Sequence, residues 1–200
     1  MDVYSYLTMR RVVLASASPR RRDLLAAARI ACRVAPADIP EVLGKGETAE
    51  QYVARLASEK AAAAPAGADE LVLAADTTVV VNGQVLEKPS DAEDAARMLR
   101  LLSGGTHMVL TGICWRDGER ARVAVERTLV RVARLSEEDI RTYVESGEPF
   151  GKAGAYGIQG MFSRWVDGVE GCYFNVVGLP VGRVWRELEM LAASLADERS

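Results

Sequence analysis

The run Ser16-Ala17-Ser18-Pro19-Arg20-Arg21-Arg22 places hydroxyl and guanidinium groups at the expected start of a helix. Each cation in the first helical turn is unfavourable by about 0.3–1 kcal/mol, because the helix N-terminus carries partial positive charge. An anion bound by the free N–H groups of the helix start, with Ser16, Ser18 and at least one arginine, would offset this repulsion. The run therefore predicts an anion site. A solvated helix face is the alternative, and it suits Arg22 and, less well, Arg21.

A second set of candidates lies on a predicted β-hairpin. Its strands are Leu71–Val81 and Gln84–Lys88, joined by Asn82-Gly83, a dipeptide that favours a two-residue turn between apolar runs. Because such a turn fixes the pairing of the two strands, Thr77 should lie opposite Lys88.

Asp76 then falls in the middle of an otherwise apolar strand, on the other face and diagonal to Glu87. A carboxylate is costly there unless it is paired or functional. Asp76 can serve as a general base or metal ligand, with Glu87 as a second metal ligand and Lys88 as a phosphate partner. A structural Asp76–Lys88 ion pair is the alternative, and the residues alone leave both interpretations open.

The third candidate is the segment Gly151–Gly160, which has a glycine at every third position. It matches neither a P-loop nor a dinucleotide fingerprint. Its glycines would let backbone N–H groups approach a ligand, Lys152 supplies charge, and Gln159 has the paired donor and acceptor needed to read a base edge. A tight surface loop would have a similar pattern. Asp38 and Glu41 are candidate metal ligands only because they are acidic.

The basic residues are unevenly divided: 21 of the 25 are arginine, and the lysines are Lys45, Lys60, Lys88 and Lys152. Codon bias explains the scarcity of lysine but not the positions that remain. A compact ammonium on a flexible stem suits a mobile polyphosphate, so Lys60, Lys88 and Lys152 are candidate phosphate partners, while Lys45 is left without an explanation. Lys60 falls on the apolar row of a helix predicted from the capping box at Thr48–Gln51, and it should therefore point inward.

Several classes of protein are disfavoured by composition. The single histidine, His107, makes a Ser-His-Asp triad or a two-histidine metal site improbable, and it is expected to cap or pack near its strand. The cysteines Cys32, Cys114 and Cys172 are too far apart for a zinc site and indicate thiols in a reducing cytoplasm. The net charge of −3 gives no basic field for a nucleic-acid polymer. Residues 1–10 have no apolar core of a signal peptide, and no apolar run approaches the length of a membrane span. A carboxylate-bound metal would be a hard cation such as Mg²⁺ or Mn²⁺.

The elements that must position these residues alternate between strands and helices, which predicts an α/β fold with a mixed sheet and two lobes. Further strands are predicted over Arg11–Ala15, Ile30–Ala35, Met108–Trp115 and Ala121–Ala133, with a strand pair in Phe162–Val177 around Asp167-Gly168. Helices are predicted from Pro19 with Ser18 as N-cap, from Thr48, from Ser90-Asp91-Ala92-Glu93 to Gly104-Gly105, from Ser136 to Gly147, and over Val181–Leu195.

Five stretches, in this order, resemble the Maf family of nucleoside triphosphate pyrophosphatases. They are LASASPRRRDLL from Leu14, SEKA from Ser58, AADTTVVVNGQVLEKPSDAEDAARMLRLLSGGTH from Ala74, SGEPFGKAGAYGIQG from Ser146 and YFNVVGLP from Tyr173. The resemblance implies a single Maf-like domain over residues 11–200, preceded by an extension over residues 1–10. The implied architecture is a mixed central sheet flanked by helices, with two lobes around a cleft, and a possible homodimer.

The resemblance also implies a reaction, the metal-dependent hydrolysis of a nucleoside triphosphate to monophosphate and pyrophosphate. Asp76 matches the family's proton acceptor. Arg20, Thr77 and Gln159 match positions that separate the family's branches, and their combination is similar to the dTTP/UTP branch rather than the 7-methyl-GTP branch. Four further residues match polar positions of the same site: Glu41, Lys60, Lys88 and Lys152.

Two other functions stay open at this point. One is a pyrophosphatase for 7-methyl-GTP or another non-standard nucleotide, because Met161–Trp165 differs from the smaller residues of relatives. The other is a non-enzymatic, nucleotide-binding regulator of septum formation, a role to which the family name refers. A house-cleaning enzyme with a link to cell-division arrest is the expectation that the resemblance favours.

Overall fold

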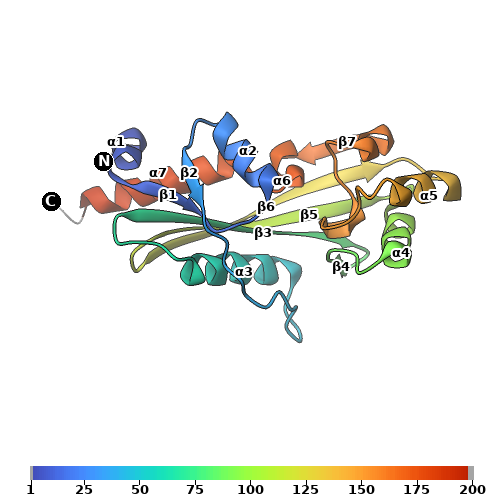
Figure 1. Cartoon of the computed structure of the whole chain (residues 1–200), viewed down its shortest axis with the longest axis horizontal. Coiled ribbons are helices and arrows are strands. Elements are labelled where there is room, and N and C mark those ends of the chain that lie inside the picture. The colour runs from blue at the N-terminus through green and yellow to red at the C-terminus, as the bar shows by residue number, and fades with distance from the viewer. Residues whose placement is uncertain (1, 198–200) are drawn as a thin grey trace. The chain divides into compact units, whose positions relative to one another are not determined.

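The computed structural model describes residues 2–197 and has the α/β architecture that the sequence predicts (Figure 1). Its helices are α1 (Val3–Met9), α2 (Pro19–Ala27), α3 (Ala49–Ala63), α4 (Ala92–Leu102), α5 (Glu137–Glu145), α6 (Tyr173–Val177) and α7 (Val181–Asp197). Its strands are β1 (Arg11–Leu14), β2 (Cys32–Val34), β3 (Glu70–Val81), β4 (Gln84–Leu86), β5 (Thr106–Asp117), β6 (Arg120–Val132) and β7 (Val166–Gly171). The short 3₁₀ helix η1 (Ala153–Ala155) lies within the glycine-rich segment, and a second, η2 (Met161–Trp165), directly follows it.

The sheet is mixed, as predicted. Its strand order is β2-β1-β3-β5-β6-β7, and β4 pairs with β3 outside this path. β1 runs parallel to both β2 and β3, whereas the β3–β4 and β6–β7 pairs are antiparallel. None of the described helices is long and apolar enough to cross a membrane.

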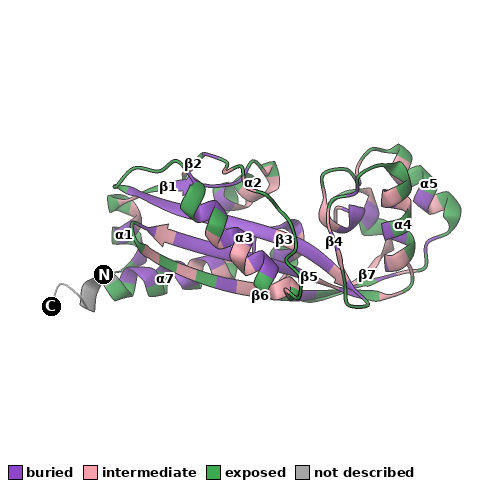
Figure 2. Ribbon diagram, turned by 90° about the horizontal axis from the view of Figure 1, so that it is seen from below, coloured by how far each residue is buried: buried purple, intermediate pink, exposed green. Residues whose placement is uncertain are grey.

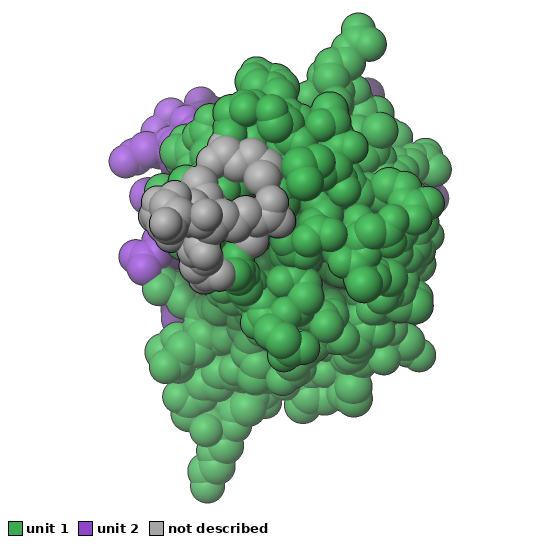
Figure 3. Space-filling view, turned by 90° about the vertical axis from the view of Figure 1, so that its left-hand side faces the viewer, with its two compact units in different colours: residues 1–76, 111–126, 178–200 green, residues 77–110, 127–177 purple. Residues whose placement is uncertain are grey.

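The chain divides into two compact units, coloured separately in Figure 3. Unit 1 contains residues 1–76, 111–126 and 178–200, and unit 2 contains residues 77–110 and 127–177. β3 therefore contributes to both units, and the division falls directly after Asp76. Each unit is described by itself below.

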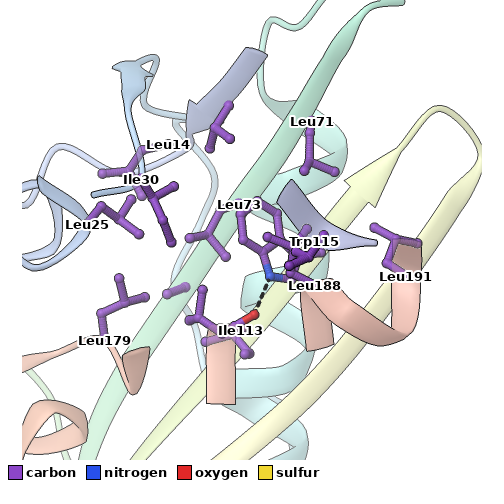
Figure 4. Packing of buried hydrophobic residues seen from close by; sticks show 14 of the residues in the cluster. Leu14, Leu25, Ile30, Leu71, Leu73, Ile113, Trp115, Leu179, Leu188 and Leu191 are labelled. Atoms are coloured by element: carbon purple, nitrogen blue, oxygen red, sulfur yellow. Dashed lines mark hydrogen bonds between the residues drawn. The ribbon is translucent and has the colours of Figure 1, made fainter. Parts of the chain in front are cut away.

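Unit 1 has apolar clusters formed by alternate residues of the same strands. In β3, Leu71, Leu73 and Ala75 pack with residues of α1, α2 and α7, while Val72 and Ala74 pack with α3. This alternation follows from the two-residue period of a strand, and the buried stretches of β3 are visible in Figure 2. The larger cluster is centred on Trp115, whose indole N–H donates to the Val184 carbonyl at 2.9 Å (Figure 4).

The same period decides where Asp76 points. It follows Val72 and Ala74 on the α3 side of β3, where Ala57 and Ala61 form the facing surface of the helix. α3 lies very close to the sheet, because a Cβ at Gly112 of β5 would lie 2.1 Å from the Val53 carbonyl oxygen. The sequence therefore puts Asp76 and α3 together.

Unit 2 contains the predicted hairpin. The turn residues Asn82 and Gly83 have φ values of 50° and 75°, and Val81 pairs with Gln84 as expected. The ladder ends at the Val79–Leu86 pair, so the predicted pairing of Thr77 with Lys88 was wrong. Directly after the ladder, the Glu87 carbonyl accepts a hydrogen bond from the Gly154 N–H at 3.1 Å, so the glycine-rich segment packs where β4 ends.

The predicted strand pair over Phe162–Val177 was also wrong. Only Val166–Gly171 is a strand, and it pairs antiparallel with β6, while η2 precedes it and α6 follows it. The reason lies in the aromatic side chains of η2. Phe162 contacts the rings of Tyr143 and Tyr156, and Trp165 contacts the ring of Tyr143. A short helix places both side chains in this cluster, whereas a strand would point residues 162 and 165 to opposite faces.

The segment before residue 11, predicted as an extension, forms α1. Its N-cap Asp2 accepts a hydrogen bond from the Ser5 N–H, and Val3 and Tyr6 are buried in the Trp115 cluster. The Tyr6 hydroxyl donates to the buried carboxylate of Asp117 at 2.7 Å. The residues of α1 are thus part of the core of unit 1.

Candidate functional site

The centre of the candidate site in unit 1 is the pair formed by Asp76 and Lys60. The Lys60 ammonium donates to Asp76 Oδ1 at 2.6 Å, and the two residues are only 7% and 6% exposed. Lys60 comes from the last turn of α3, whose capping box at Thr48 and Gln51 forms as predicted. Asp76 is thus a buried carboxylate with a buried cation beside it.

Glu41 shares this cation. Its carboxylate also forms a salt bridge with the Lys60 ammonium, although its side chain is 30% exposed. The loop that holds Glu41 therefore reaches the buried pair, whereas Asp38 in the same loop is exposed. An ammonium between two carboxylates is well compensated, and removing it would leave two anions facing each other.

Glu41 and Asp76 are also the residues of unit 1 that fit a divalent cation. Within residues 2–197 there is no group of three or more His, Cys, Asp or Glu side chains that would form a complete metal cage. Mg²⁺ does not need one, because it is commonly held by one or two carboxylates together with substrate phosphates. The donor chemistry of this pair therefore suits a hard cation that arrives with a phosphate ligand.

The predicted anion site begins where β1 leads into α2. Ser18 is the N-cap with Pro19 after it, as predicted, and its side chain makes no capping hydrogen bond. Ser16 is 9% exposed, and its hydroxyl accepts a hydrogen bond from the Ser18 N–H at 3.3 Å. Arg20 is half-buried, and burial lowers the pKa of its guanidinium, so a neighbouring anion would compensate its lost hydration.

Arg21 has a role that the sequence interpretation missed. Its guanidinium donates to Ser16 Oγ at 3.0 Å, to the Ala75 carbonyl at 2.7 Å and to the Gly178 carbonyl at 2.8 Å. Arg21 is therefore no solvated surface residue, and it fixes the backbone next to Asp76 against the helix start. Arg22 is exposed and contacts Asp23, which agrees with the solvated face expected for it.

The remaining candidates of the hairpin lie in unit 2. Thr77 is half-buried, and Lys88 is exposed. Glu87 is half-buried, and its carboxylate accepts a hydrogen bond from the hydroxyl of Thr78 at 3.0 Å. Thr78, which is fully buried, is a further polar residue that the sequence interpretation did not single out.

The glycine-rich segment packs directly on the hairpin in unit 2. Gly154 has a φ of 68°, and a Cβ there would lie 2.8 Å from the side chain of Val79. Its N–H binds the Glu87 carbonyl, as described above. Lys152 is half-buried and its ammonium donates to the Glu148 carbonyl, while Gln159 is exposed.

The structure thus assembles the predicted residues into two groups. Unit 1 contains Ser16, Ser18, Arg20, Glu41, Lys60 and Asp76, and unit 2 contains Thr77, Glu87, Lys88, Lys152 and Gln159. His107 lies in unit 2, buried within β5 with its ring nitrogen Nε2 2.8 Å from the Tyr156 hydroxyl. It packs in its strand as expected and belongs to neither group.

Comparison with known proteins shows the family of this chain. The family model described as Maf-like protein matches residues 11–191. A dTTP/UTP pyrophosphatase of Koribacter versatilis (strain Ellin345) is 56% identical over 176 residues, which cover 88% of this chain and 91% of the relative. Proteins of the same name from Pelotomaculum thermopropionicum and Bacillus cereus are 49% and 44% identical, covering 88% and 90% of this chain and 94% and 95% of the relatives. The chain belongs to the Maf family.

Proposed function

We propose that this protein is a nucleoside triphosphate pyrophosphatase that hydrolyses dTTP and UTP to the monophosphate and pyrophosphate. The observation that carries the proposal is the buried Asp76 carboxylate, held by Lys60 in a chain whose relatives are named dTTP/UTP pyrophosphatases. The ion pair with Lys60 offsets the cost of desolvation and keeps a carboxylate in an otherwise apolar strand, where it can act as a general base.

In the proposed reaction, Asp76 takes a proton from a water molecule whose oxygen attacks the α-phosphorus. The bond between the α-phosphorus and the bridging oxygen breaks, and pyrophosphate leaves with that oxygen. Lys60 orients Asp76 through the 2.6 Å hydrogen bond. Arg21 supports the same carboxylate indirectly, because it binds the carbonyl of Ala75.

The phosphate chain is assigned to the cations and to the start of α2. Ser16, Ser18 and Arg20 offer hydroxyl and guanidinium donors at the start of α2. In unit 2, Lys88 and Lys152 provide the ammonium groups that are proposed to bind the phosphates of the nucleotide. Phosphoryl transfer depends mainly on positioning and charge stabilisation, which such a set of donors provides.

Mg²⁺ or Mn²⁺ is the proposed cofactor, with Glu41, Asp76 and Glu87 as its candidate ligands. When bound, such an ion would neutralise the charge that develops on the phosphate oxygens. The shared approach of Glu41 and Asp76 to one cation supports this assignment in unit 1.

Base recognition is assigned to Thr77 and Gln159 together with Arg20. This combination supports the dTTP/UTP branch, and the exposed amide of Gln159 has the donor and acceptor that a pyrimidine edge requires. We further propose a cytoplasmic protein, supported by its three free thiols, and a homodimer, which rests on the family resemblance. The net charge of −3 supports a nucleotide rather than a nucleic-acid polymer as the partner.

A panel of nucleotides with Mg²⁺ tests the proposal, provided that pyrophosphate and phosphate are measured separately. We expect pyrophosphate from dTTP and UTP. Preference for 7-methyl-GTP, ITP or XTP would reject the branch, and release of no pyrophosphate at micromolar enzyme would favour a non-enzymatic regulator.

The Asp76→Asn variant tests the role of the carboxylate in the same assay. We expect turnover to fall by about 10²–10⁴-fold with nucleotide binding intact, the usual contribution of a general base. Asp69→Asn is the matched control, because Asp69 directly precedes β3 and is exposed. Full turnover by Asp76→Asn would remove Asp76 from the mechanism.

A further inference from the structure

Glu148, which the proposed mechanism does not use, lies beneath the segment that carries Gln159. One of its carboxylate oxygens, Oε1, accepts a hydrogen bond from the Tyr143 hydroxyl at 2.9 Å. The other, Oε2, accepts one from the Met161 N–H at 2.9 Å. Both acceptor atoms of this carboxylate are therefore engaged by donors within unit 2.

Tyr143 extends the same network to the other end of the segment. Its hydroxyl oxygen accepts a hydrogen bond from the Gly157 N–H at 3.1 Å while its proton is donated to Glu148. Residues 157 and 161 are thus both anchored to one side-chain pair, and Gln159 lies midway between these anchors. Within the segment, the Gly160 N–H donates to the Gly157 carbonyl at 3.2 Å, which closes the turn around Gln159.

The approach of Glu148 to the segment depends on the missing Cβ atoms. A Cβ at Gly160 would lie 2.2 Å from Glu148 Oε1, and one at Gly157 would lie 3.0 Å from Cε of Lys152. The carboxylate therefore occupies the space that a side chain at residue 160 would need. At these two positions, the absence of a Cβ atom lets the side chains of Glu148 and Lys152 pack against the backbone of the segment. The glycines there make room for these side chains rather than for a ligand.

Tyr143 is itself held in place by packing. It is fully buried, and its ring centroid lies 5.4 Å from that of Phe162 and 5.8 Å from that of Trp165. Burial also raises the pKa of Tyr143 above its usual value, so the phenol stays protonated and can donate to Glu148. The anchor of the segment is therefore rigid on the side of α5.

We infer that Glu148 is a positioning residue for Gln159, acting with Tyr143 to fix the segment Gly157–Met161 and thereby to set the selectivity for the base. The inference rests on the proposed function, in which Gln159 contacts the base. Only a carboxylate provides acceptors to both Tyr143 and Met161, because the amide of glutamine would present a donor to one of them.

Base selectivity provides the first test. In Glu148→Ala, we expect the ratio of kcat/KM for UTP to that for CTP to fall about tenfold, the size expected for a lost hydrogen bond to a charged group. Hydrolysis of methyl triphosphate, which has no base, should change by less than about twofold. Glu148→Gln should recover part of the ratio, and Tyr143→Phe should lower it. Glu145→Ala is the matched control, since Glu145 lies in the last turn of α5 and is exposed.

A double-mutant cycle with Gln159→Ala separates positioning from general damage. If Glu148 acts through Gln159, then Glu148→Ala has no further effect on the UTP:CTP ratio once Gln159 is alanine. An unchanged ratio in Glu148→Ala, additive effects in the cycle, or an equal loss with methyl triphosphate would each overturn the inference.

Amide hydrogen exchange tests the inference independently of catalysis. In Glu148→Ala, exchange at Gly157 and Met161 should be about tenfold faster than in the unmodified protein, with β5 unaffected. If the unmodified protein releases no pyrophosphate from UTP, the proposed function fails, and exchange alone then decides whether Glu148 fixes the segment. Unchanged protection at both amides would overturn the inference whatever the activity.

Discussion

Lys60 is the residue on which most of the candidate site in unit 1 depends. It is one of four lysines in a chain with 21 arginines, and its ammonium lies between Glu41 and Asp76. A compact ammonium can approach two carboxylates from a buried helix position, where a planar guanidinium would need more space. The geometry of the contact therefore explains why lysine, and not the more frequent arginine, occupies position 60.

Replacing Lys60 by methionine should destabilise the protein by about 3 kcal/mol, because it leaves a buried carboxylate without its cation. The double variant Lys60→Met/Asp76→Asn should be more stable than the sum of the single effects predicts, by about 1–3 kcal/mol. Urea unfolding at neutral pH measures these free energies of unfolding.

The control for this cycle is Lys45→Met, since Lys45 is exposed between Gly44 and Gly46. It should change the free energy of unfolding by less than about 0.5 kcal/mol. Strictly additive effects of the two substitutions at Lys60 and Asp76 would mean that the hydrogen bond between them contributes nothing to stability.

The sequence predicted that Lys60 points inward, but it did not predict the contact between Lys60 and Asp76. The spacing Tyr52, Leu56, Lys60 identified the inward face of α3, because it depends only on helical periodicity. The contact with Asp76 depends on which helix packs on the face of β3 that carries Asp76. The sequence alone does not predict that this helix is α3. The three hydrogen bonds of Arg21 were missed for the same reason, since two of their acceptors are backbone carbonyls distant in the chain.

At the scale of elements, the position of α3 depends on Gly112 in β5. A Cβ at Gly112 would lie 2.1 Å from the carbonyl oxygen and 2.4 Å from the carbonyl carbon of Val53. Gly112→Ala would therefore push α3 away from the sheet, and it should cost at least about 2 kcal/mol of stability, in the range of overpacked cores. Thermal and urea unfolding of the variant measure this loss.

Gly182→Ala in α7 is the matched control for this substitution. The nearest atom to a Cβ there is the end of the Arg186 side chain at 3.6 Å, so alanine fits without displacement. It should keep or raise the stability by up to about 1 kcal/mol, as alanine favours a helix over glycine. A Gly112→Ala protein as stable as Gly182→Ala would show that α3 can move at no cost.

Elements were predicted correctly where their signals are local. The Asn82-Gly83 turn fixed the register of β3 and β4, and Ser136 caps α5 through a capping box with Asp139. The packing at the end of β4 was not predictable, because the Glu87 carbonyl binds the N–H of Gly154, which lies far along the chain. The error over Phe162–Val177 has the same cause, because the ring contacts of η2 are made with Tyr143 and Tyr156 from other segments of the chain.

At the scale of the whole molecule, the two units have different buried titratable groups. Unit 2 contains His107, which is 2% exposed, and burial lowers its pKa to about 4. Its Nδ1 is buried and has no hydrogen-bond partner among the described residues, so protonation would add a donor without an acceptor. In unit 1, hydrogen bonds from Arg55 to Glu47 and from Arg33 to Glu70 lower the pKa of each carboxyl to about 2.

These pKa shifts predict that acid weakens unit 2 before unit 1. Because His107 has a pKa of about 4 in the folded protein and 6.5 when unfolded, the unfolded chain binds more protons between these values. The free energy of unfolding of unit 2 should therefore decrease as the pH is lowered from 7 through this window. At pH 5 it should be about 2 kcal/mol lower than at pH 7. Glu47 and Glu70 weaken unit 1 only as the pH falls from 4.5 towards 2.

Hydrogen exchange of each unit between pH 7 and pH 5, corrected for intrinsic exchange rates, measures this difference. The His107→Gln variant should keep a hydrogen bond to Tyr156 and should lose the pH dependence of unit 2, because glutamine does not titrate. Exchange in unit 1 serves as the internal control and should be equal in both proteins. Acid could instead weaken unit 2 of His107→Gln as much as it weakens unit 2 of the unmodified protein. In that case the burial of His107 is not the source of the acid sensitivity, and carboxylates of unit 2 must cause it.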